Sequence, residues 1–218
     1  MKRLLDIVLS CTALVVLVPF LIPVIIILRL TGEGEVFYIQ ERVGRGGKSF
    51  GLYKFATMLK NSPNIGAGEI TVRGDPRVLP FGRFLRKTKL NELPQLWNIF
   101  IGDMSIVGPR PMVLNTYAYY SEEVRQKLNT IRPGLTGIGS IVFRDEERYL
   151  ANRNEPMEFY RQQIIPYKSD LELWFVENST LWLYIKIVFV TAWVIFFPSS
   201  KIVGKAFTGI PSLPDSLV

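Results

Sequence analysis

The residues best suited to chemistry lie in the stretch RKTKLNELPQLWN, residues 86–98. This stretch places the carboxylate of Glu92 beside the amide of Asn91, just after a cluster of basic residues that begins at Arg86. Carboxylates hold metal ions or transfer protons, and clustered cations bind phosphate groups. The pattern leaves three alternatives open: half of a two-carboxylate centre, a modified centre, or an ordinary charged helix surface.

The composition limits which chemistry is available. The 218 residues include no histidine and a single cysteine, Cys11. Histidine-bearing zinc sites and Ser-His triads are therefore excluded, and proton transfer falls to Asp, Glu, Lys, Tyr or Cys. No intrachain disulfide can form, which fits a reducing compartment. The length suits one domain with a core, or one domain and a membrane anchor.

The positive charge is clustered. The net charge is +7, and residues 73–89 hold six basic residues against one acidic residue, Asp75. Such a patch favours partners that carry phosphate: nucleic acid, nucleotides or anionic lipid headgroups. A solvated basic face is the alternative on charge alone.

A second polar stretch, GDMSIVGPRP, follows at residues 102–111. Its two glycines and two prolines predict a tight loop rather than a continued helix. The loop carries Asp103 and Arg110, and an arginine can bind phosphate through two parallel hydrogen bonds. A rigid turn at a helix end is the structural alternative.

Short elements must position these side chains. Apolar residues at three- and four-residue steps predict a helix over residues 81–101, and the β-prone residues 36–41 and 49–55 predict a hairpin with a glycine-rich turn. The turn ends in Gly47-Lys48-Ser49, like a nucleotide P-loop. Arg42 occupies the position where that motif requires glycine and no helix follows, so a P-loop is not expected.

Further helices are expected toward the C-terminus. Residues 121–131 read as a helix that begins at an imperfect capping box at Ser121. Residues 143–150 read as a charged helix with an exposed face. Residues 181–197 are strongly apolar but short for a membrane span, so we expect a helix packed in the domain or lying in the membrane interface. A second membrane pass is the alternative.

The N-terminal run from Leu4 to Leu28 is apolar apart from three residues. As a helix it would reach roughly 37 Å, enough to cross a bilayer. However, Pro19 and Pro23 interrupt it, and basic residues flank both ends. Prolines favour a kink, and positive charge is normally kept on the cytoplasmic side. A helix that enters the membrane, bends and returns to the same face is one reading; an ordinary span is the other.

Several ordered motifs carry a resemblance to a known family: KRLLDI from residue 2, LYKFATM from residue 52, GRFLRKTKLNELPQLWNIFIGDMSIVGPRP from residue 82, and IRPGLTGIGS from residue 131. The chain resembles the bacterial sugar transferases, the small monotopic phosphoglycosyl transferases that start glycan assembly on a lipid carrier. The likeness extends from residue 2 to about residue 197. It argues against a membrane-anchored protein that simply grips anionic lipid or nucleic acid.

The resemblance implies a fold and a location. The expected fold is α+β and mainly helical: a re-entrant membrane helix over residues 1–30, bent near Pro19, and a compact catalytic domain with a small hairpin over residues 31–197. A C-terminal tail would occupy residues 198–218. The domain would lie on the cytoplasmic face of the bacterial inner membrane.

The resemblance also implies a reaction. A nucleotide-diphosphate sugar, by resemblance a UDP-sugar, would give its sugar phosphate to polyprenol phosphate, the undecaprenyl form above all. No nucleic-acid partner is expected, and a homo-oligomer is left open. We expect specificity for the sugar to lie in loops at residues 61–77 and 138–148.

Residue roles carry over by motif. Glu92 stands at the Mg²⁺ position, Asn91 at the nucleophile position, and Asp103 at the carboxylate of the GDMS motif. Four basic residues are expected to bind substrate phosphate: Arg86, Arg110, Lys54 and Arg132.

Two positions depart from the family pattern. Asn91 replaces an aspartate that attacks phosphorus in relatives, and Ala56 replaces a basic residue. An amide is a poor nucleophile. Three readings remain: direct attack by polyprenol phosphate, replacement of the aspartate by another carboxylate such as Asp103, or a non-catalytic relative that binds sugar nucleotide or acts as a scaffold.

Overall fold

The computed structural model describes residues 1–65, 74–150, 155–197, 200 and 202–217. The fold is mainly helical with a small antiparallel hairpin, which confirms the expected α+β class. The first elements are α1 (Lys2–Leu30), β1 (Phe37–Val43), η1 (Arg45–Gly47), β2 (Ser49–Phe55), η2 (Ser62–Asn64), α2 (Pro80–Lys87), η3 (Leu90–Glu92), α3 (Gln95–Ile101) and β3 (Ser105–Val107). The later elements are α4 (Leu114–Tyr117), α5 (Glu122–Leu128), β4 (Gly134–Thr136), α6 (Ile138–Val142), α7 (Glu146–Leu150), α8 (Pro156–Phe159), the π-helical turn η4 (Tyr160–Ile164), α9 (Ile165–Glu177), α10 (Leu181–Phe196), α11 (Ile202–Ala206) and η5 (Asp215–Leu217).

The predicted hairpin is confirmed. Strands β1 and β2 pair antiparallel, with Phe37 opposite Phe55 and Val43 opposite Ser49. Gly46 and Gly47 in the turn have φ angles of 73° and 72°, a left-handed backbone that glycine adopts without strain. A strand and not a helix follows the turn, so the structure also lacks the helix that a P-loop requires here.

The prediction of one continuous helix over residues 81–101 is wrong. It is divided into α2, the single turn η3 and α3. Lys89 has a φ of 60°, which ends the helical path, and Pro94 caps α3 because proline cannot continue a helix from the preceding turn. The division places Asn91 and Glu92 on η3, a short turn between two helices.

The loop predicted at residues 102–111 contains a strand that the sequence did not indicate. Strand β3 pairs in parallel with β4, with Ser105 opposite Gly134 and Val107 opposite Thr136. The backbones approach so closely that a Cβ at Gly108 would lie 2.4 Å from the Arg132 oxygen. Glycine is therefore required in the GPRP motif by packing.

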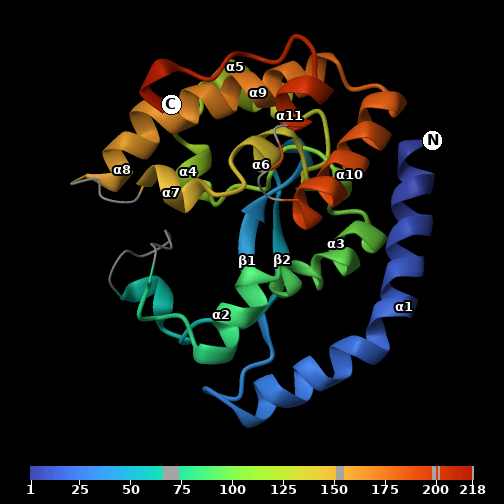
Figure 1. Cartoon of the computed structure of the whole chain (residues 1–218), viewed down its shortest axis with the longest axis vertical. Helices are drawn as coiled ribbons and strands as arrows, with labels where there is room; N and C mark the ends of the chain where they lie inside the picture. Colours follow the sequence, from blue (N-terminus) through green and yellow to red (C-terminus); the bar gives the residue numbers. More distant parts are fainter. Residues whose placement is uncertain (66–73, 151–154, 198–199, 201, 218) are drawn as a thin grey trace.

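The largest core lies between α6, α9 and α10, and Figure 1 shows α9 and α10 in the upper part of the molecule. The buried face of α10 includes Tyr184 and Ile187. The expectation that this helix packs in the domain is therefore confirmed. Phe207 and Leu217 belong to this core. The segment expected as a tail thus contributes to the packing of the domain.

Two other helix expectations had different outcomes. Ser121 caps α5 by accepting a hydrogen bond from the Val124 N–H at 3.3 Å, so this predicted start is confirmed. The segment 143–150 was expected to be an exposed charged helix, but Phe143 and Leu150 are buried. Phe143, Tyr149 and Leu150 belong to or pack against the core, while Arg144, Asp145, Glu146 and Arg148 line a cleft.

Helix α1 lies along the outside of the domain and is bent. Figure 1 shows its axis changing direction within the helix, and both Pro19 and Pro23 lie inside it. In the described part of the chain it is the one helix long and apolar enough to cross a membrane. In its first turn, the Arg3 guanidinium donates hydrogen bonds to the carbonyl oxygens of Ile99 and Phe100 at 2.6 and 2.8 Å.

The carboxyl group of Asp6 joins α1 to the domain. This side chain is 2% exposed, and its Oδ1 accepts hydrogen bonds from the Tyr184 hydroxyl at 2.7 Å and from the Ser105 hydroxyl and the Ile106 N–H at 2.9 Å each. A buried carboxyl group is costly unless its oxygen atoms are hydrogen-bonded. One atom therefore ties α1 to both β3 and α10.

We expect Asp6→Ala to lower the free energy of unfolding by about 3 kcal/mol, because it leaves three donors without their acceptor. Thermal denaturation of the protein in detergent measures this loss. Ser10→Ala is the matched control: Ser10 is also buried in α1, but its hydroxyl donates within the helix, to the Asp6 backbone oxygen at 2.6 Å. Equal melting temperatures for Asp6→Ala and wild type would contradict the assigned role.

Candidate active site

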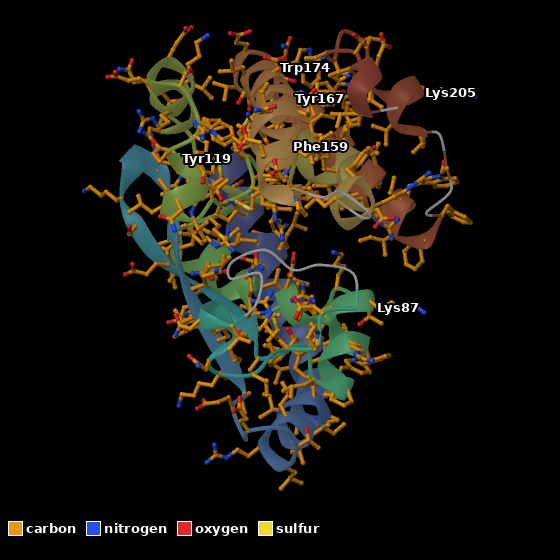
Figure 2. The ribbon with its side chains drawn as sticks, turned by 90° about the vertical axis from the view of Figure 1, so that its left-hand side faces the viewer. Lys87, Tyr119, Phe159, Tyr167, Trp174 and Lys205 are labelled. Atoms are coloured by element: carbon orange, nitrogen blue, oxygen red, sulfur yellow. The ribbon has the colours of Figure 1, made fainter. Side chains whose placement is uncertain are left out.

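A large cleft of about 2960 Å³ contains the candidate chemistry. Its lining includes Lys87 of α2, and Tyr119 and Tyr167. Figure 2 shows Lys87 in the lower group of elements and the two tyrosines in the upper group. The cleft is therefore bounded by parts of the chain that are distant in sequence.

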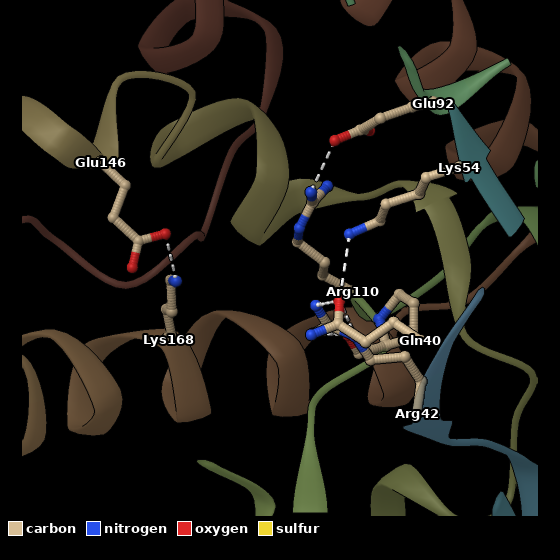
Figure 3. Close-up of polar contacts among 8 residues, drawn as sticks. Gln40, Arg42, Lys54, Glu92, Arg110, Glu146 and Lys168 are labelled. Atoms are coloured by element: carbon tan, nitrogen blue, oxygen red, sulfur yellow. Dashed lines mark hydrogen bonds and ion pairs between the residues drawn. The ribbon is translucent and has the colours of Figure 1, made fainter. Parts of the chain in front are cut away.

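Glu92 and Arg110 form an ion pair in this cleft. The Arg110 Nη2 donates to Glu92 Oε1 at 2.8 Å, and the Glu92 side chain is only 16% exposed (Figure 3). Burial alone would raise the pKa of Glu92, but the charge and hydrogen bond of Arg110, with Lys54 and Lys89, hold that pKa at about 2. Glu92 is thus a carboxylate at any physiological pH.

Lys54 approaches the same place from β2. Its Nζ donates to the Gln40 Oε1 at 3.4 Å, and Gln40 also accepts from the Arg42 Nε at 3.2 Å (Figure 3). Burial, together with the charges of Arg42 and Arg110, lowers the pKa of Lys54 to about 7. Bound anionic phosphate would restore the charged form, so this lysine is suited to an anionic ligand.

Asn91 lies beside Glu92 on η3 and lines the cleft. It is 8% exposed, and its Oδ1 accepts no hydrogen bond from the residues that the structure describes. A buried carbonyl oxygen without a partner is uncommon in folded proteins. A bound cation or a donor group of a ligand would satisfy it.

The described residues contain no cluster of three or more His, Cys, Asp or Glu side chains placed to hold a metal ion. Mg²⁺ does not need one, since it usually keeps several waters and is bound by one or two carboxylates together with substrate phosphates. The ionised Glu92 and the unpartnered Oδ1 of Asn91 are hard oxygen atoms of the required kind. These two residues therefore fit a Mg²⁺ site that is completed by substrate.

The basic patch at residues 73–89 has two different roles. Arg83, Arg86, Lys87 and Lys89 line the cleft. Arg77 instead is 3% exposed, pairs with Asp75 at 2.6 Å and donates to the Ser62 oxygen at 2.8 Å. Arg73 lies outside the described residues, as do residues 66–73 of the loop expected to set specificity. Arg77 therefore holds the chain in place and is not available to bind phosphate.

The structure brings together Asn91, Glu92, Arg86, Arg110 and Lys54, all of which line the cleft. Asp103 and Arg132 are not among its lining residues. Asp103 Oδ2 accepts from Asn98 Nδ2 at 3.2 Å, and Arg132 Nε donates to the Gly102 oxygen at 2.7 Å. Their hydrogen bonds stabilise the loop after α3, so the geometry does not support Asp103 as a substitute for the missing aspartate.

Sequence reasoning missed most of a polar group on the other side of Arg110: Glu146 lies in the loop expected to set specificity, but Tyr160, Lys168 and Glu172 were not predicted. Lys168 Nζ donates to Glu146 Oε2 at 2.7 Å (Figure 3). Both residues line the cleft, as do Tyr160 and Glu172. These residues come from α7, η4 and α9. One signal was available: Lys168 and Glu172 are four residues apart in an otherwise largely apolar helix, a spacing that places them on one face.

Comparisons with known proteins give a consistent result. The model of the bacterial sugar transferase family matches residues 1–198. The undecaprenyl-phosphate galactose phosphotransferase of Salmonella typhimurium is 34% identical over 89% of this chain and 40% of its own length. A UDP-N-acetylgalactosamine-undecaprenyl-phosphate N-acetylgalactosaminephosphotransferase of Aeromonas hydrophila is 31% identical, over 87% of this chain and 42% of its own.

This chain covers a larger share of a shorter relative. The UDP-glucose:undecaprenyl-phosphate glucose-1-phosphate transferase of Caulobacter vibrioides is 34% identical over 86% of this chain and 66% of its own. The chain thus spans about two-fifths of the length of the first two relatives and about two-thirds of this one.

We expect Arg110→Gln to change how stability depends on pH. Because the pKa of Glu92 is below its ordinary value in the folded protein, its contribution is complete above about pH 4.5 and is lost as the pH falls toward 2. Without Arg110 this contribution is missing, so the variant should be less stable at pH 7. The gap to wild type should narrow by about 2 kcal/mol between pH 7 and pH 3.

Urea denaturation in detergent, monitored by tryptophan fluorescence, measures the difference in stability between wild type and Arg110→Gln. Arg83→Gln, which removes another arginine of the cleft, is the control and should leave the pH dependence unchanged. A constant gap between wild type and Arg110→Gln across this pH range would rule out the assigned pairing.

Proposed function

Because the chain belongs to the bacterial sugar transferase family, we propose that it transfers a sugar 1-phosphate from a nucleotide-diphosphate sugar to polyprenol phosphate. The names of its relatives support UDP as the nucleotide and undecaprenyl phosphate as the acceptor. The product, a sugar joined to lipid through a diphosphate, would begin assembly of a glycan or exopolysaccharide. The observation that carries this proposal is an ionised Glu92 within a strongly cationic cleft.

The reaction forms one phosphorus–oxygen bond and breaks another. An oxygen of the acceptor phosphate attacks the sugar-bearing phosphorus, and the bond from that phosphorus to the bridging oxygen breaks. The nucleoside monophosphate leaves with the electron pair. The cations of the cleft, above all Arg110, Lys54 and Arg86, face the charge that develops on these oxygens, and such fixed charges are a main source of catalysis in phosphoryl transfer.

Mg²⁺, when bound, would neutralise part of the diphosphate charge. Glu92 and the Oδ1 of Asn91 are the residues that would hold it. Glu92 is already ionised by its surroundings, so cation binding need not remove a proton from it.

We favour direct attack by the acceptor over a covalent intermediate on this chain. The Asn91 amide can hold a phosphate oxygen through its N–H groups, but it is a poor nucleophile. Asp103 lies outside the cleft lining. The acceptor phosphate is itself an anion, so the displacement does not need a protein nucleophile.

The arrangement of α1 supports a re-entrant helix. Its first turns bond to α3, β3 and α10, and its last turns place Val24 and Leu28 in a core cluster with Phe55 and Leu85. Both parts of a bent helix therefore contact the same domain, which a straight span with that domain on one side of the bilayer does not allow. We place this domain on the cytoplasmic face, where basic flanking residues are normally kept.

The exposed face of α10 fits the same arrangement. Trp182, Phe189, Trp193 and Phe196 are 47–77% exposed and recur on one side of the helix. Aromatic residues of this kind favour the membrane interface. Helix α10 begins next to α1, since Lys2 Nζ donates to the Ser179 oxygen at 2.6 Å.

Turnover tests the proposed reaction. Purified protein in detergent, with undecaprenyl phosphate, Mg²⁺ and UDP-glucose, UDP-galactose or UDP-N-acetylgalactosamine, should release UMP with at least one of these sugars. Glu92→Gln should abolish the release, because it removes the carboxylate proposed to hold Mg²⁺. Glu92→Gln that retains the wild-type rate would remove Glu92 from the metal site.

Asn91→Asp separates the remaining readings in the same assay. A silent wild type that Asn91→Asp activates would identify a folded site without its nucleophile, and thus a relative that binds sugar nucleotide without turnover. An active wild type whose reaction shows no covalent sugar phosphate on the protein would support direct attack.

Accessibility of single cysteines tests the membrane arrangement. In a Cys11→Ser background, Lys2→Cys and Lys48→Cys should both react with a membrane-impermeant maleimide only from the cytoplasmic side, because a re-entrant helix returns to the face it entered. Labelling of residue 2 from the periplasm, with residue 48 still cytoplasmic, would replace the re-entrant helix by a spanning one.

A further inference from the structure

The charge of the cleft is divided between two walls. One wall is mainly cationic and includes Arg42, Lys54, Arg86, Lys89 and Arg110 around the carboxylate of Glu92. The other, here called the polar wall, consists of Ser140, Glu146, Tyr160, Lys168 and Glu172. Acidic and hydroxyl groups outnumber the one lysine in the polar wall. Arg144 and Arg148 also line the cleft next to Glu146, but cations are more numerous in the first wall, so a diphosphate is attracted more strongly to the first wall.

The positive charge of Lys168 is compensated by other groups of the polar wall. Its Nζ donates to Glu146 Oε2 at 2.7 Å and to the Tyr160 hydroxyl at 3.4 Å, and it lies 5.1 Å from the ring centres of both Phe143 and Tyr160. The side chain is 14% exposed. A lysine whose charge is already paired has little attraction for a phosphate, but its remaining hydrogen-bonding capacity suits a neutral polar ligand.

Glu172 brings hydrogen-bonding capacity that the protein itself does not use. It is 5% exposed, and its Oε2 has no hydrogen-bond partner among the described residues; the Ser140 hydroxyl is in the same condition. Burial raises the pKa of Glu172 to about 7, so near neutral pH its carboxyl group can donate as well as accept. A Cβ at Gly139 would lie 2.4 Å from Glu172 Oε1, so glycine makes room for this carboxyl group.

Arg110 joins the two walls. Its guanidinium pairs with Glu92, and Glu146 and Tyr160 are near enough to raise its pKa further. The Glu172 carboxyl group lies beside the Arg110 backbone N–H. In a nucleotide sugar the transferred sugar is bonded directly to the second phosphate. A diphosphate held by Arg110 would therefore place that sugar next to the polar wall.

We propose that the polar wall binds the hydroxyl groups of the transferred sugar and so determines which nucleotide sugar is accepted. This inference rests on the proposed function. The polar groups of this wall come from four elements, α6, α7, η4 and α9. A site built to hydrogen-bond a hydroxyl group discriminates strongly against analogues that cannot satisfy it, because its own buried groups are then left without partners.

Binding measurements on wild type, Lys168→Met, Glu172→Gln and Ser140→Ala test this inference. Dissociation constants are measured by calorimetry for UDP, UDP-glucose, UDP-galactose and UDP-N-acetylgalactosamine. We expect the affinity for UDP to stay within about twofold of wild type, while Lys168→Met and Glu172→Gln weaken the preferred UDP-sugar at least about tenfold. Ser140→Ala, a small change, should reduce the preference less and guards against misfolding of the other two variants.

Lys186→Met is the matched control. Lys186 lies on α10 and contacts an aromatic ring, that of Phe207 at 5.5 Å, but it is not a lining residue of the cleft. This variant should keep both the affinity for UDP and the preference among sugars. Thermal denaturation of every variant shows that it is folded.

The outcomes separate the two proposals. Equal weakening of UDP and all UDP-sugars by Lys168→Met and Glu172→Gln would assign the polar wall to the nucleoside, and overturn the inference. An unchanged preference in every folded variant would also overturn it while leaving the proposed function intact. Wild type that binds none of the four nucleotides would overturn the proposed function, and the inference with it.

Discussion

The three hydrogen bonds that Asp6 accepts determine where α1 lies and, through β3, where the cleft is built. Ser105 and Ile106 belong to β3, which leads within a few residues to Arg110. The third donor, Tyr184, belongs to α10 and so connects the same atom to the largest core. An acidic residue in an apolar helix is tolerated only where such partners exist. Membrane attachment and site geometry are therefore coupled through one carboxyl group.

Arg110 has a similar position within the cleft. Its guanidinium keeps Glu92 ionised, and its backbone lies against Glu172 of the polar wall. The close approach of Gly108 to the chain at residues 132–134 fixes the turn that carries it. The GPRP motif can thus be understood physically as a glycine-dependent crossing that presents one arginine to two chemically different walls.

Local patterns predicted the elements that depend on local physics. The hairpin, the capped helix at Ser121 and the apolar α1 follow from alternation, capping and length. The prediction of one helix over residues 81–101 failed because Lys89 adopts a left-handed backbone and because a new helix, α3, begins after Pro94. Strands β3 and β4 have three residues each and pair across a long separation, so no periodicity reveals them.

Only part of the candidate site could be predicted from the sequence. Motif resemblance identified Glu92, Arg110 and Lys54, but it could not separate residues that face the cleft from Asp103, whose hydrogen bond holds a loop. Ser140 and Glu146 of the polar wall lie in the loop expected to set specificity, but Tyr160, Lys168 and Glu172 were missed because burial creates their properties. Glu172 is an ordinary helical glutamate in the sequence, and its burial in the folded protein, where Gly139 leaves room for it, makes its carboxyl group unusual.

The anchoring of Asp6 also has a consequence for biosynthesis. Ser105 and Tyr184 follow Asp6 in the chain by 99 and 178 residues. A ribosome therefore releases α1, with its acidic residue, well before either hydroxyl group exists. During that interval water or lipid headgroups must solvate the carboxyl group, which keeps the first turns of the helix at the membrane surface. Final seating of the helix is thus a late event that waits for the domain to fold.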